Sequence, residues 1–410
     1  MLLVGDARMA FPIAKALNRA GHNVFAGVSI YSNYLEWSRH LSGSFQHASL
    51  EPGSDEGLPT ILNWIDERGD IDVIQPVSEA GLRTTTRHRA AFDSRAALIA
   101  PAAETVERCS NKPAMFALCD EVGAPLAAHG AARDLPQLRE LCERIGFPLI
   151  VKPATVDAPL AGRKALILQG RTALDAALDE WPEEHPDLLV QRYVRGPRHS
   201  VVFTADRGRL LGAVQVKAAR THEYDGTGYT TYGVTVAPEP QVKRAVERLV
   251  DALDYTSTGC AQFIVDPRSG ETTFMELNPR VSLGRIAECA GLPHSVWGLK
   301  LALGERIEAP ADPWAFRRGV RYVWTKGDLT LLKDLIADRA IGPAAATAYL
   351  GRIVADACTC HHAIFDPLDP APAVGVYLNR WISRWRTRPV SSDVSAAVVD
   401  SVEPTGPVGA

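Results

Sequence analysis

The feature that most constrains this chain is a pair of apolar runs separated by a short cluster of turn-forming residues. The runs are 261–265 and 274–278, and the cluster between them, 266–270, reads Asp-Pro-Arg-Ser-Gly. Apolar runs on both sides of such a cluster predict a β-hairpin. A turn centred near its serine makes Gln262 and Glu276 cross-strand partners, with Cβ atoms about 5 Å apart on one face of the sheet.

The residues that follow Glu276 extend the same polar face. Asn278 lies two residues further along the strand and projects to the same side, and Arg280 follows if the chain stays extended. Carboxylate and amide oxygens are hard donors that suit Mg²⁺ shared with nucleotide phosphates. A guanidinium beside such a metal is placed to meet phosphoryl oxygens. A solvated surface hairpin is the alternative, but polar residues in register on one face favour a metal–phosphate site.

Length and composition limit the class of protein. With 410 residues the chain is too long for one simple core, so two or three domains are expected. Its 46% hydrophobic and 22% charged residues are typical of a globular protein. The net charge of −4 gives no bulk basic field, so neither nucleic acid nor an anionic membrane is an expected partner.

The location of the protein is also predicted from what the sequence contains. No apolar run approaches the ~18 residues of a membrane span, and the N-terminus lacks a signal-peptide layout. The seven cysteines, an odd number, suggest reduced thiols in the cytoplasm. Cys358, Cys360, His361 and His362 form a local metal-like cluster, but without the usual paired-cysteine spacing a partly buried strand or loop is preferred over zinc.

The first hundred residues alternate strand and helix signals. Apolar strands are expected at 1–4, 23–28 and 72–76, and amphipathic helices at 12–20 and 58–68. This alternation predicts right-handed βαβ units on a parallel, Rossmann-like sheet. The turn after the first strand reads Gly-Asp-Ala-Arg rather than Gly-x-Gly-x-x-Gly, so a dinucleotide site is poorly supported.

Two lysines and one strand end in the middle of the chain suggest nucleotide contacts. Lys152 leaves a buried strand, so its ammonium needs a partner, either a phosphate or a surface ion pair. Lys112 opens a helix whose N-terminus favours anions, although solvated lysines are common. Gln191 ends an apolar strand where backbone groups could read an adenine edge, with Tyr193 and Val194 lining the ring pocket; a plain strand-to-turn exit is the alternative.

Taken in order along the chain, these motifs resemble the ATP-grasp superfamily, with features of carbamoyl-phosphate synthetase and biotin carboxylase. The similarity covers roughly residues 1–305, and the Glu-x-Asn-Pro-Arg element at 276–280 is its most specific part. The resemblance implies an α/β and α+β fold. The expected units are a Rossmann-like N-terminal domain at 1–105, an ATP-grasp domain of two subdomains at 106–305 with its lid at about 148–190, a small C-terminal α/β module at 306–385, and a disordered tail at 386–410.

The resemblance also implies a role for each motif residue. Lys112 and Lys152 would contact the phosphates, His199 would contact the ribose, and the adenine would be contacted by Gln191, Tyr193 and Val194. Mg²⁺, with Mn²⁺ as an alternative ion, would be bound by Gln262, Glu276 and Asn278. Arg280 and Lys152 would stabilise the transferring phosphoryl group. Most members have glutamate in place of Gln262, and one fewer charge should weaken metal binding modestly. The lid loop at 154–164 has one glycine, so Arg163 or Lys164 would have to compensate for lost N–H donors.

The loop at 217–233 occupies the region that faces the acceptor substrate in related ligases. Lys217, Arg220 and Tyr232 are candidates to pair with a substrate carboxylate, and a solvated surface loop is the alternative. The leading hypothesis is an ATP-dependent carboxylate–amine ligase that releases ADP and phosphate. Phosphorylation of bicarbonate, a hydroxyl or an enol, and a non-catalytic nucleotide-binding module, remain open, as do a homodimer and the identity of both substrates.

Overall fold

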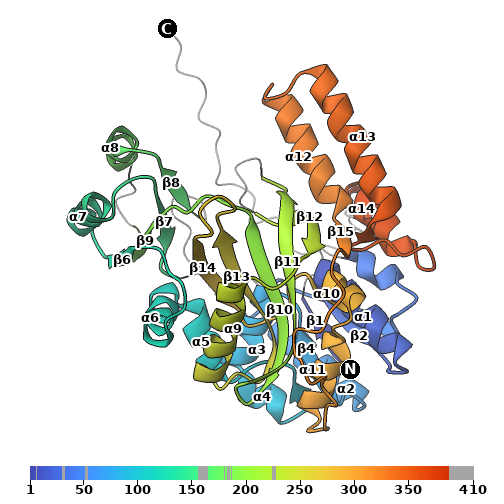
Figure 1. The fold of residues 1–410 in the computed structure, drawn as a ribbon. Coiled ribbons are helices and arrows are strands. Elements are labelled where there is room, and N and C mark those ends of the chain that lie inside the picture. Colours follow the sequence, from blue (N-terminus) through green and yellow to red (C-terminus); the bar gives the residue numbers. More distant parts are fainter. Residues whose placement is uncertain are drawn as a thin grey trace, which may run out of the picture.

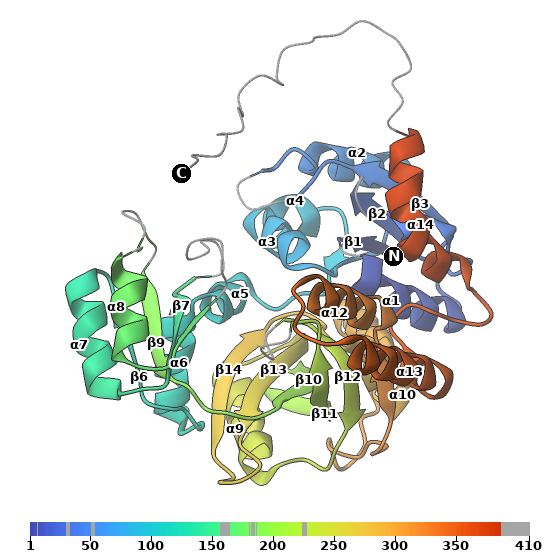
Figure 2. The same cartoon turned by 90° about the horizontal axis from the view of Figure 1, so that it is seen from above.

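The computed structural model of the chain describes residues 1–5, 7–29, 33–50, 54–155, 165–179, 181, 185, 187–223 and 228–386. Within them lie three β-sheets, each packed against helices (Figure 1). Seen from above, the small sheet with its helices stands to one side of the large sheet, and the N-terminal sheet lies beside both (Figure 2).

The N-terminal unit is the parallel sheet that the alternation predicts. Its strand order is β3-β2-β1-β4-β5, and all four pairings are parallel. The strands β3 and β5 lie outside the predicted set: β3 is mostly polar, and β5 is only two residues long. The elements are β1 (Leu2–Val4), α1 (Ala7–Arg19), β2 (Phe25–Ser29), the 3-10 helix η1 (Asn33–Trp37), β3 (Gly43–His47), α2 (Leu58–Arg68), β4 (Val73–Pro76), α3 (Glu79–Arg87), α4 (Arg89–Asp93) and β5 (Ala97–Leu98).

The strand order of this sheet creates a topological switch point between β1 and β4. The chain leaves β1 toward β2 and β3 on one side and returns to β4 and β5 on the other. In open α/β sheets the crevice outside the carboxyl ends of such strands is the preferred ligand site. Gly5 and Ser78, which follow β1 and β4, are in close contact there, since a Cβ on Gly5 would lie 2.3 Å from the Ser78 hydroxyl. The helices α1 and α3 begin beside this crevice.

A small antiparallel sheet forms the second unit. Its order is β6-β9-β7-β8, and one face packs on two helices through a core that includes Leu149, Val151 and Val190. The helix α6 begins where predicted, because the Asn111 side chain accepts a hydrogen bond from the Ala114 N–H, and it ends at a left-handed Gly123. The elements are α5 (Ala103–Ser110), α6 (Lys112–Val122), β6 (His129–Ala132), α7 (Leu135–Ile145), β7 (Leu149–Pro153), β8 (Leu166–Leu168), α8 (Arg171–Asp179) and β9 (Leu188–Arg192).

The third unit is a seven-stranded sheet of order β14-β13-β10-β11-β12-β15-β16. One face packs on α9 and α6 through side chains such as Phe203 and Phe263, and the other packs on α1, α10 and α11 through side chains such as Val202 and Cys260. The elements are β10 (Arg198–Asp206), β11 (Arg209–Thr221), β12 (Thr230–Thr235), α9 (Pro240–Ala252), β13 (Ser257–Val265), β14 (Thr272–Asn278), α10 (Gly284–Ala290) and α11 (His294–Ala302).

The C-terminal segment extends the large sheet and then returns to the N-terminal domain. Its strands β15 (Arg321–Val323) and β16 (His361–His362) flank a hairpin of α12 (Thr325–Ala337) and α13 (Pro343–Thr359) that projects from the body (Figure 1). The final helix α14 (Ala371–Arg386) lies against η1. The predicted boundaries of a separate module at 306–385 stay a prediction, and the predicted disordered tail lies outside the described residues from 387 onward.

A buried polar cluster fastens this returning segment. Asp366 forms an ion pair with Lys15 of α1, and Asp369 accepts a hydrogen bond of 2.6 Å from Ser38. All four side chains are buried. Among the described residues no helix is long and apolar enough to cross a membrane.

Candidate active site

The β13–β14 hairpin has the predicted register. Gln262 pairs with Glu276, and Ser200 of β10 pairs with Gln262 from the other side. The register shifts by one residue directly after Gln262, so that Phe263 pairs with Phe274 and Met275 is the extra residue of a β-bulge. Such bulges re-aim a side chain, and this one turns Glu276 toward Gln262 while the apolar residues nearer the turn stay in the core.

Asn278 lies beside Glu276 on the same face. Its Nδ2 donates a hydrogen bond of 3.0 Å to Glu276 Oε1. The half-buried carboxylate, the nearly buried Gln262 amide and the Asn278 amide therefore form one group of oxygen donors, which fits Mg²⁺. Of these three candidate ligands only Glu276 is anionic, and across the described residues no three His, Cys, Asp or Glu side chains form a metal cluster.

Lys152 approaches this group from the small sheet. Its Nζ lies 3.4 Å from Gln191 Oε1, a neutral partner. Burial lowers the pKa of Lys152 to about 8, with Glu276 raising it and Lys112 lowering it further. The amide oxygen of Gln191 does not neutralise the charge of the buried ammonium, so this position suits an anionic ligand such as phosphate.

Lys112 lies at the first turn of α6, next to the strand that carries Lys152. Its Nζ donates a hydrogen bond of 2.9 Å to the Pro153 carbonyl, and its backbone N–H donates to the Ala154 carbonyl at 3.0 Å. Burial lowers the pKa of Lys112, opposed by the charges of Glu276 and Glu79. Both predicted phosphate-contacting lysines therefore lie close to the predicted metal ligands.

His199 and Arg198 project to opposite faces of the large sheet. Arg198 lies on the face that carries Gln262 and Glu276, here called the metal face, and His199 lies on the other. His199 pairs with Phe263 and Lys217, so by strand alternation it projects to the opposite face from Ser200 and Gln262. There Gln215 Nε2 lies 2.7 Å from His199 Nδ1, and burial lowers the pKa of His199 to about 4. The ribose contact implied for His199 stays a prediction.

Arg198 is a candidate that the motif comparison did not select. Its Nη2 donates a hydrogen bond of 3.0 Å to Thr230 Oγ1, while its buried Nε has no hydrogen-bond partner among the described residues. Burial lowers the pKa of Arg198, and the charge of Glu276 opposes this. Counting alternate residues along β10 back from Ser200 would have identified it.

Arg280 leaves the hairpin and meets the N-terminal domain. Its Nε donates a hydrogen bond of 2.8 Å to Glu79 Oε2, at the first residue of α3. Burial would lower the pKa of Arg280, but the charge and hydrogen bond of Glu79 outweigh it and raise the pKa above its ordinary value. Glu79 was not predicted, because no local pattern links positions 201 residues apart.

The predicted adenine hinge follows β9. Gln191 is buried, and its Nε2 donates a hydrogen bond of 3.1 Å to Thr273 Oγ1. The backbone N–H of Tyr193 donates to the Pro148 carbonyl at 2.9 Å, and Val194 is buried. Gln191 thus links the small sheet to β14, and the adenine contacts of all three residues stay predictions.

The three predicted acceptor-substrate residues have different surroundings. Arg220 Nη2 lies 2.8 Å from carboxylate oxygens of both Asp328 and Asp356, and its guanidinium stacks 4.7 Å from the centre of the Tyr232 ring. Lys217, opposite His199, projects to the face away from Glu276. Arg220 and Tyr232 thus join the sheet to the helical hairpin, and a substrate role for any of the three stays a prediction.

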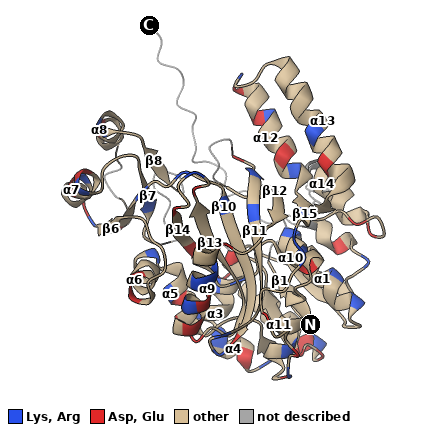
Figure 3. Ribbon diagram, viewed as in Figure 1, with Lys and Arg blue, Asp and Glu red and all other residues tan. Residues whose placement is uncertain are grey.

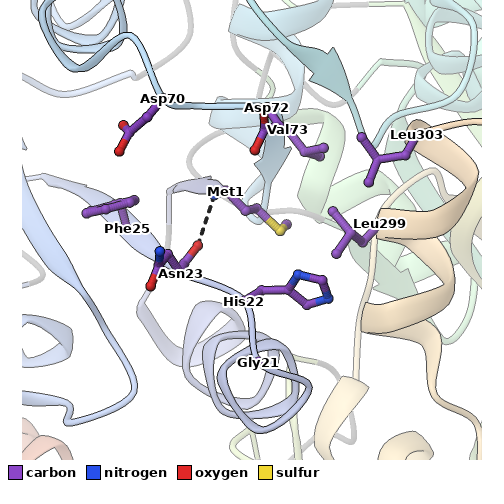
Figure 4. Close-up of a pocket in the computed structure, with 10 residues that line it drawn as sticks. All are labelled: Met1, Gly21, His22, Asn23, Phe25, Asp70, Asp72, Val73, Leu299 and Leu303. Atoms are coloured by element: carbon purple, nitrogen blue, oxygen red, sulfur yellow. Dashed lines mark hydrogen bonds between the residues drawn. The ribbon is translucent and has the colours of Figure 1, made fainter.

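The glycine-poor lid loop is described only in part. Residues 156–164, which include Arg163 and Lys164, lie outside the described residues. A separate hollow of about 270 Å³ lies at the amino ends of the N-terminal strands, lined by residues such as Met1, His22 and Asp72 (Figure 4). Because β1 runs away from this hollow toward Gly5, it is not part of the site described above.

Comparisons with known proteins identify relatives of this chain. Residues 111–309 match the family model of the carbamoyl-phosphate synthase L chain, ATP binding domain. The match begins one residue before Lys112 and contains Lys152, Glu276 and Arg280 in the predicted order. The resemblance to the ATP-grasp superfamily is thereby confirmed over residues 111–309. The ATP-grasp fold predicted from the sequence is thus confirmed, as is its association with ATP and Mg²⁺ at the level of the family.

Among curated proteins, two matches illustrate the relationship. The ATP-grasp chain is 26% identical over 220 residues to the mitochondrial methylcrotonoyl-CoA carboxylase subunit alpha of Oryza sativa, which covers 50% of the chain and 30% of that protein. It is 24% identical over 273 residues to the C-terminal section of the carbamoyl phosphate synthase large chain of Methanopyrus kandleri, which covers 62% of the chain and 48% of that protein. The chain thus spans less than half the length of these relatives.

Solved structures share the ATP-grasp fold over most of the chain. Biotin carboxylase of Campylobacter jejuni, in complex with an ATP analogue, has a TM-score of 0.61 at 16% identity, over 78% of this chain and 74% of that one. The biotin carboxylase domain dimer of Hydrogenobacter thermophilus 2-oxoglutarate carboxylase, which holds MgADP and bicarbonate, has a TM-score of 0.60 at 18% identity, over 78% and 72%. N5-carboxyaminoimidazole ribonucleotide synthetase has a TM-score of 0.57 at 14% identity, over 75% and 77%.

Proposed function

We propose that the protein is an ATP-dependent ligase that activates a carboxylate as an acyl phosphate and joins it to an amine, releasing ADP and phosphate. ATP-dependent ligation is the chemistry of the relatives with which the chain shares its ATP-grasp domain. The carbon–nitrogen bond, the substrates and the site residues are the new elements of the proposal. The expectations of a homodimer and of a cytoplasmic location stay predictions beside it.

The observation that carries the proposal is the charge around Glu276. The charge of this one carboxylate acts on the pKa values of Lys112, Lys152, Arg198 and Arg280. With Glu79 as the second carboxylate, the group holds four cations against two anions. Each of the four side chains is half-buried or more, so its charge is partly desolvated and needs a counter-ion to offset the energetic cost. The group therefore fits a polyanion such as a triphosphate.

Each of these side chains has a distinct role toward bound ATP. Lys112 and Lys152 would hold phosphate oxygens from the small sheet, and Arg280 would neutralise charge that develops on the transferring phosphoryl group. Glu276, Asn278 and Gln262 would hold Mg²⁺, which would supply positive charge to neutralise phosphate oxygens. Glu79 would orient the Arg280 guanidinium rather than touch the nucleotide.

The proposed reaction has two balanced steps. In the first, a substrate carboxylate oxygen forms a bond to the γ-phosphorus while the bond between that phosphorus and the β–γ bridging oxygen breaks, and ADP leaves. In the second, an amine nitrogen forms a bond to the acyl carbon while the carbon–oxygen bond to phosphate breaks, so phosphate leaves and the amine proton passes to solvent. Arg280 is suited to stabilise the negative charge in both steps.

Bicarbonate is a second candidate acceptor of the phosphoryl group. It is favoured by one observation, which is that a structural relative with the same fold holds MgADP and bicarbonate. The first step is the same for bicarbonate and for an organic acid, so the residues around Glu276 do not distinguish them. Product analysis does.

The test is release of ADP by the purified protein with Mg-ATP and pools of amino acids and small carboxylic acids, with mass spectrometry of the products. ADP release with a product equal to acid plus amine minus water supports the ligase. ADP release that requires bicarbonate and yields no such product supports the second candidate. ATP binding without turnover over the whole panel would favour a non-catalytic module and contradict the proposal.

Variants of Glu276 complete the test. Glu276→Gln removes the one anionic metal ligand and should abolish ADP release while the unfolding temperature changes little. Glu140→Gln makes the same chemical change on the exposed face of α7 and should leave turnover unchanged. A folded and fully active Glu276→Gln protein would overturn the metal assignment.

A further inference from the structure

Arg198 is the cation of the candidate site that extends across the large sheet. It is the first residue of β10, it lies on the metal face, and its partner on β13 is Ile264. Beside it the next two strands carry the small residues Ala218 and Gly233, which pair with each other. The Arg198 side chain extends in this direction, and its Nη2 donates a hydrogen bond of 3.0 Å to Oγ1 of Thr230, the first residue of β12.

The strand order places this guanidinium on the far side of the metal ligands from the small sheet. The small sheet contacts β14 through Gln191, whereas β12 lies beyond β13, β10 and β11. Basic residues on strands of both sheets appear in blue in Figure 3. Lys112 and Lys152 therefore approach Glu276 from the small sheet, and Arg198 approaches it from the opposite side. A nucleotide held from the small sheet leaves this opposite side for the acid that receives its γ-phosphoryl group.

The guanidinium of Arg198 lies close to the region on which Arg280 acts. Burial raises the pKa of the Cys260 thiol to about 12, Glu276 raises it further, and Arg280 and Arg198 both lower it. Cys260 lies on β13 and pairs with Asn278, one of the candidate metal ligands. The two guanidiniums therefore converge on one short stretch of the β13–β14 hairpin, beside the metal ligands.

The guanidinium of Arg198 also has unused hydrogen-bonding capacity. Over the part of the chain that the structure describes, Arg198 donates one hydrogen bond, to a neutral hydroxyl, and forms no ion pair. Its buried Nε has no partner among the same residues. Arg280 and Arg220 differ from it, because each is paired with a carboxylate. A desolvated guanidinium held by a hydroxyl needs an anion, and its planar fork of N–H donors matches a carboxylate in bidentate geometry.

We infer that Arg198 binds the carboxylate that accepts the γ-phosphoryl group, and that Thr230 positions its guanidinium. In this step one oxygen of the bound carboxylate forms a bond to the γ-phosphorus while the bond from that phosphorus to the β–γ bridging oxygen breaks, and ADP leaves. Arg198 holds the acid, and Arg280 neutralises the phosphoryl group. The inference rests on the proposed function for the reaction. It adds the residue that selects a planar oxyanion, a carboxylate or bicarbonate, over a hydroxyl or an enol.

The first experiment measures binding by thermal unfolding, so that it does not depend on turnover. Wild type and Arg198→Met are unfolded with MgADP alone and with MgADP plus one probe at a time, namely bicarbonate, acetate and each proteinogenic amino acid. We expect at least one probe to raise the wild-type unfolding temperature above its value with MgADP. Arg198→Met should lose this second rise and keep the rise caused by MgADP. Arg209→Met, at the exposed first residue of β11, is the matched control and should keep both.

Three outcomes would overturn the inference. No rise with any probe would show that no such acid binds beside MgADP, and an equal rise in wild type and Arg198→Met would place the acid elsewhere. Loss of the rise caused by MgADP in Arg198→Met would make Arg198 a nucleotide contact. If Arg198→Met does not fold, Arg198→Lys gives the same comparison, because lysine keeps the charge without the bidentate fork.

The second experiment uses kinetics with an acid that supports ADP release. Arg198→Lys should raise the KM for that acid by about 10- to 100-fold, the range for a lost charged hydrogen bond, with the KM for ATP within about twofold. Thr230→Val removes the oxygen that holds the guanidinium and should raise the KM for the acid several-fold. Thr230→Ser restores a hydroxyl and should recover most of the affinity for the acid.

The two readouts keep this inference separate from the proposed function. A fall in kcat with the KM for the acid unchanged, or equal changes in both KM values, would give Arg198 a structural role and overturn the inference while the ligase stands. If the wild-type protein releases no ADP with any acid, the proposed function fails, and the unfolding temperatures still decide whether Arg198 binds a carboxylate.

Discussion

The Nε of Arg280 donates a hydrogen bond of 2.8 Å to Glu79 Oε2, and this contact joins the ATP-grasp hairpin to the N-terminal domain. Arg280 is largely buried and Glu79 about one-third exposed. In the proposed reaction the Arg280 guanidinium points at the transferring phosphoryl group, and Glu79, at the first residue of α3 in the N-terminal domain, is placed to fix its direction.

Replacing Glu79 should therefore slow the reaction without weakening nucleotide binding. We expect Glu79→Ala to lower kcat by about tenfold or more, since a misdirected arginine loses charge stabilisation in the transition state. Glu79→Gln, which keeps an acceptor oxygen, should lose less. The KM for ATP should stay within about twofold. Glu104→Gln, in the exposed first turn of α5, is the control. Equal losses in Glu79→Gln and Glu79→Ala would argue against orientation by hydrogen bonding.

Gln262→Glu should change stability in opposite directions without and with metal. A second carboxylate directly opposite Glu276 adds a like-charge pair, which costs about 0.5–1 kcal/mol of unfolding free energy in the absence of a cation. In saturating Mg²⁺ the added carboxylate should instead raise the free energy of unfolding, because a metal ion that binds only the folded protein stabilises it. Thermal unfolding in EDTA and in MgCl₂ measures both. A variant destabilised equally in the two conditions would count against a metal at this pair.

Nucleotide binding should weaken as the pH rises through about 8. The folded pKa of Lys152, lowered by burial to about 8, lies below the ordinary lysine pKa of 10.5, so the unfolded chain holds more protons between these two pH values. Burying the charged Lys152 lowers the free energy of unfolding. This loss has its full value below pH 8 and disappears as the pH rises toward 10.5. Phosphate needs the charged form, so affinity falls as that form is lost.

Calorimetry of ADP binding between pH 7 and pH 9.5 measures this effect. At pH 9, one unit above the pKa of about 8, we expect about tenfold weaker binding than at pH 7. Lys152→Arg keeps its charge throughout and should bind with little pH dependence. A wild-type affinity that stays constant to pH 9.5 would be incompatible with a phosphate contact by Lys152.

The ion pairs of Arg220 should be a large contribution to the stability of the helical hairpin. Asp328 is fully buried and accepts from Arg220 at 2.8 Å and 3.2 Å. Asp328→Ala leaves a buried guanidinium with one carboxylate, and we expect a loss of about 3 kcal/mol in the free energy of unfolding. Asp334→Ala, an exposed aspartate of the same helix, should cost under about 0.5 kcal/mol. Chemical denaturation measures both, and the paired change Arg220→Leu with Asp328→Leu should recover part of the loss.

Local chemistry explains which parts of the fold and site could be predicted. The pairing of Gln262 with Glu276 followed from the turn residues between them, because a hairpin turn sets the register of its strands. Asn111 and Gly123 bound α6 for equally local reasons. The ATP-grasp fold followed from the order of such motifs along the chain.

The parts that could not be predicted depend on residues distant in sequence. Nothing near Glu79 indicates that Arg280 will reach it, and nothing near Arg220 indicates two aspartates more than a hundred residues later. The comparison of motifs selected His199, whereas strand alternation places its neighbour Arg198 on the metal face. Neighbouring residues of a strand project to opposite faces of the sheet, so an error of one residue assigns a side chain to the wrong face. Similarity of motifs does not fix positions to within one residue.

The pairing of β15 with β12 has a consequence for any shortened form of this protein. Cutting the chain after residue 309, where the family match ends, would remove β15 and β16 and leave one edge of β12 unpaired, with β11 on its other side. An open strand edge is a template for self-association. The same cut would take Asp366 away from Lys15 and leave a buried ammonium without its counter-ion. We therefore expect the isolated nucleotide-binding region to aggregate, so that the smallest stable catalytic unit includes the strands and the helix that lie beyond it.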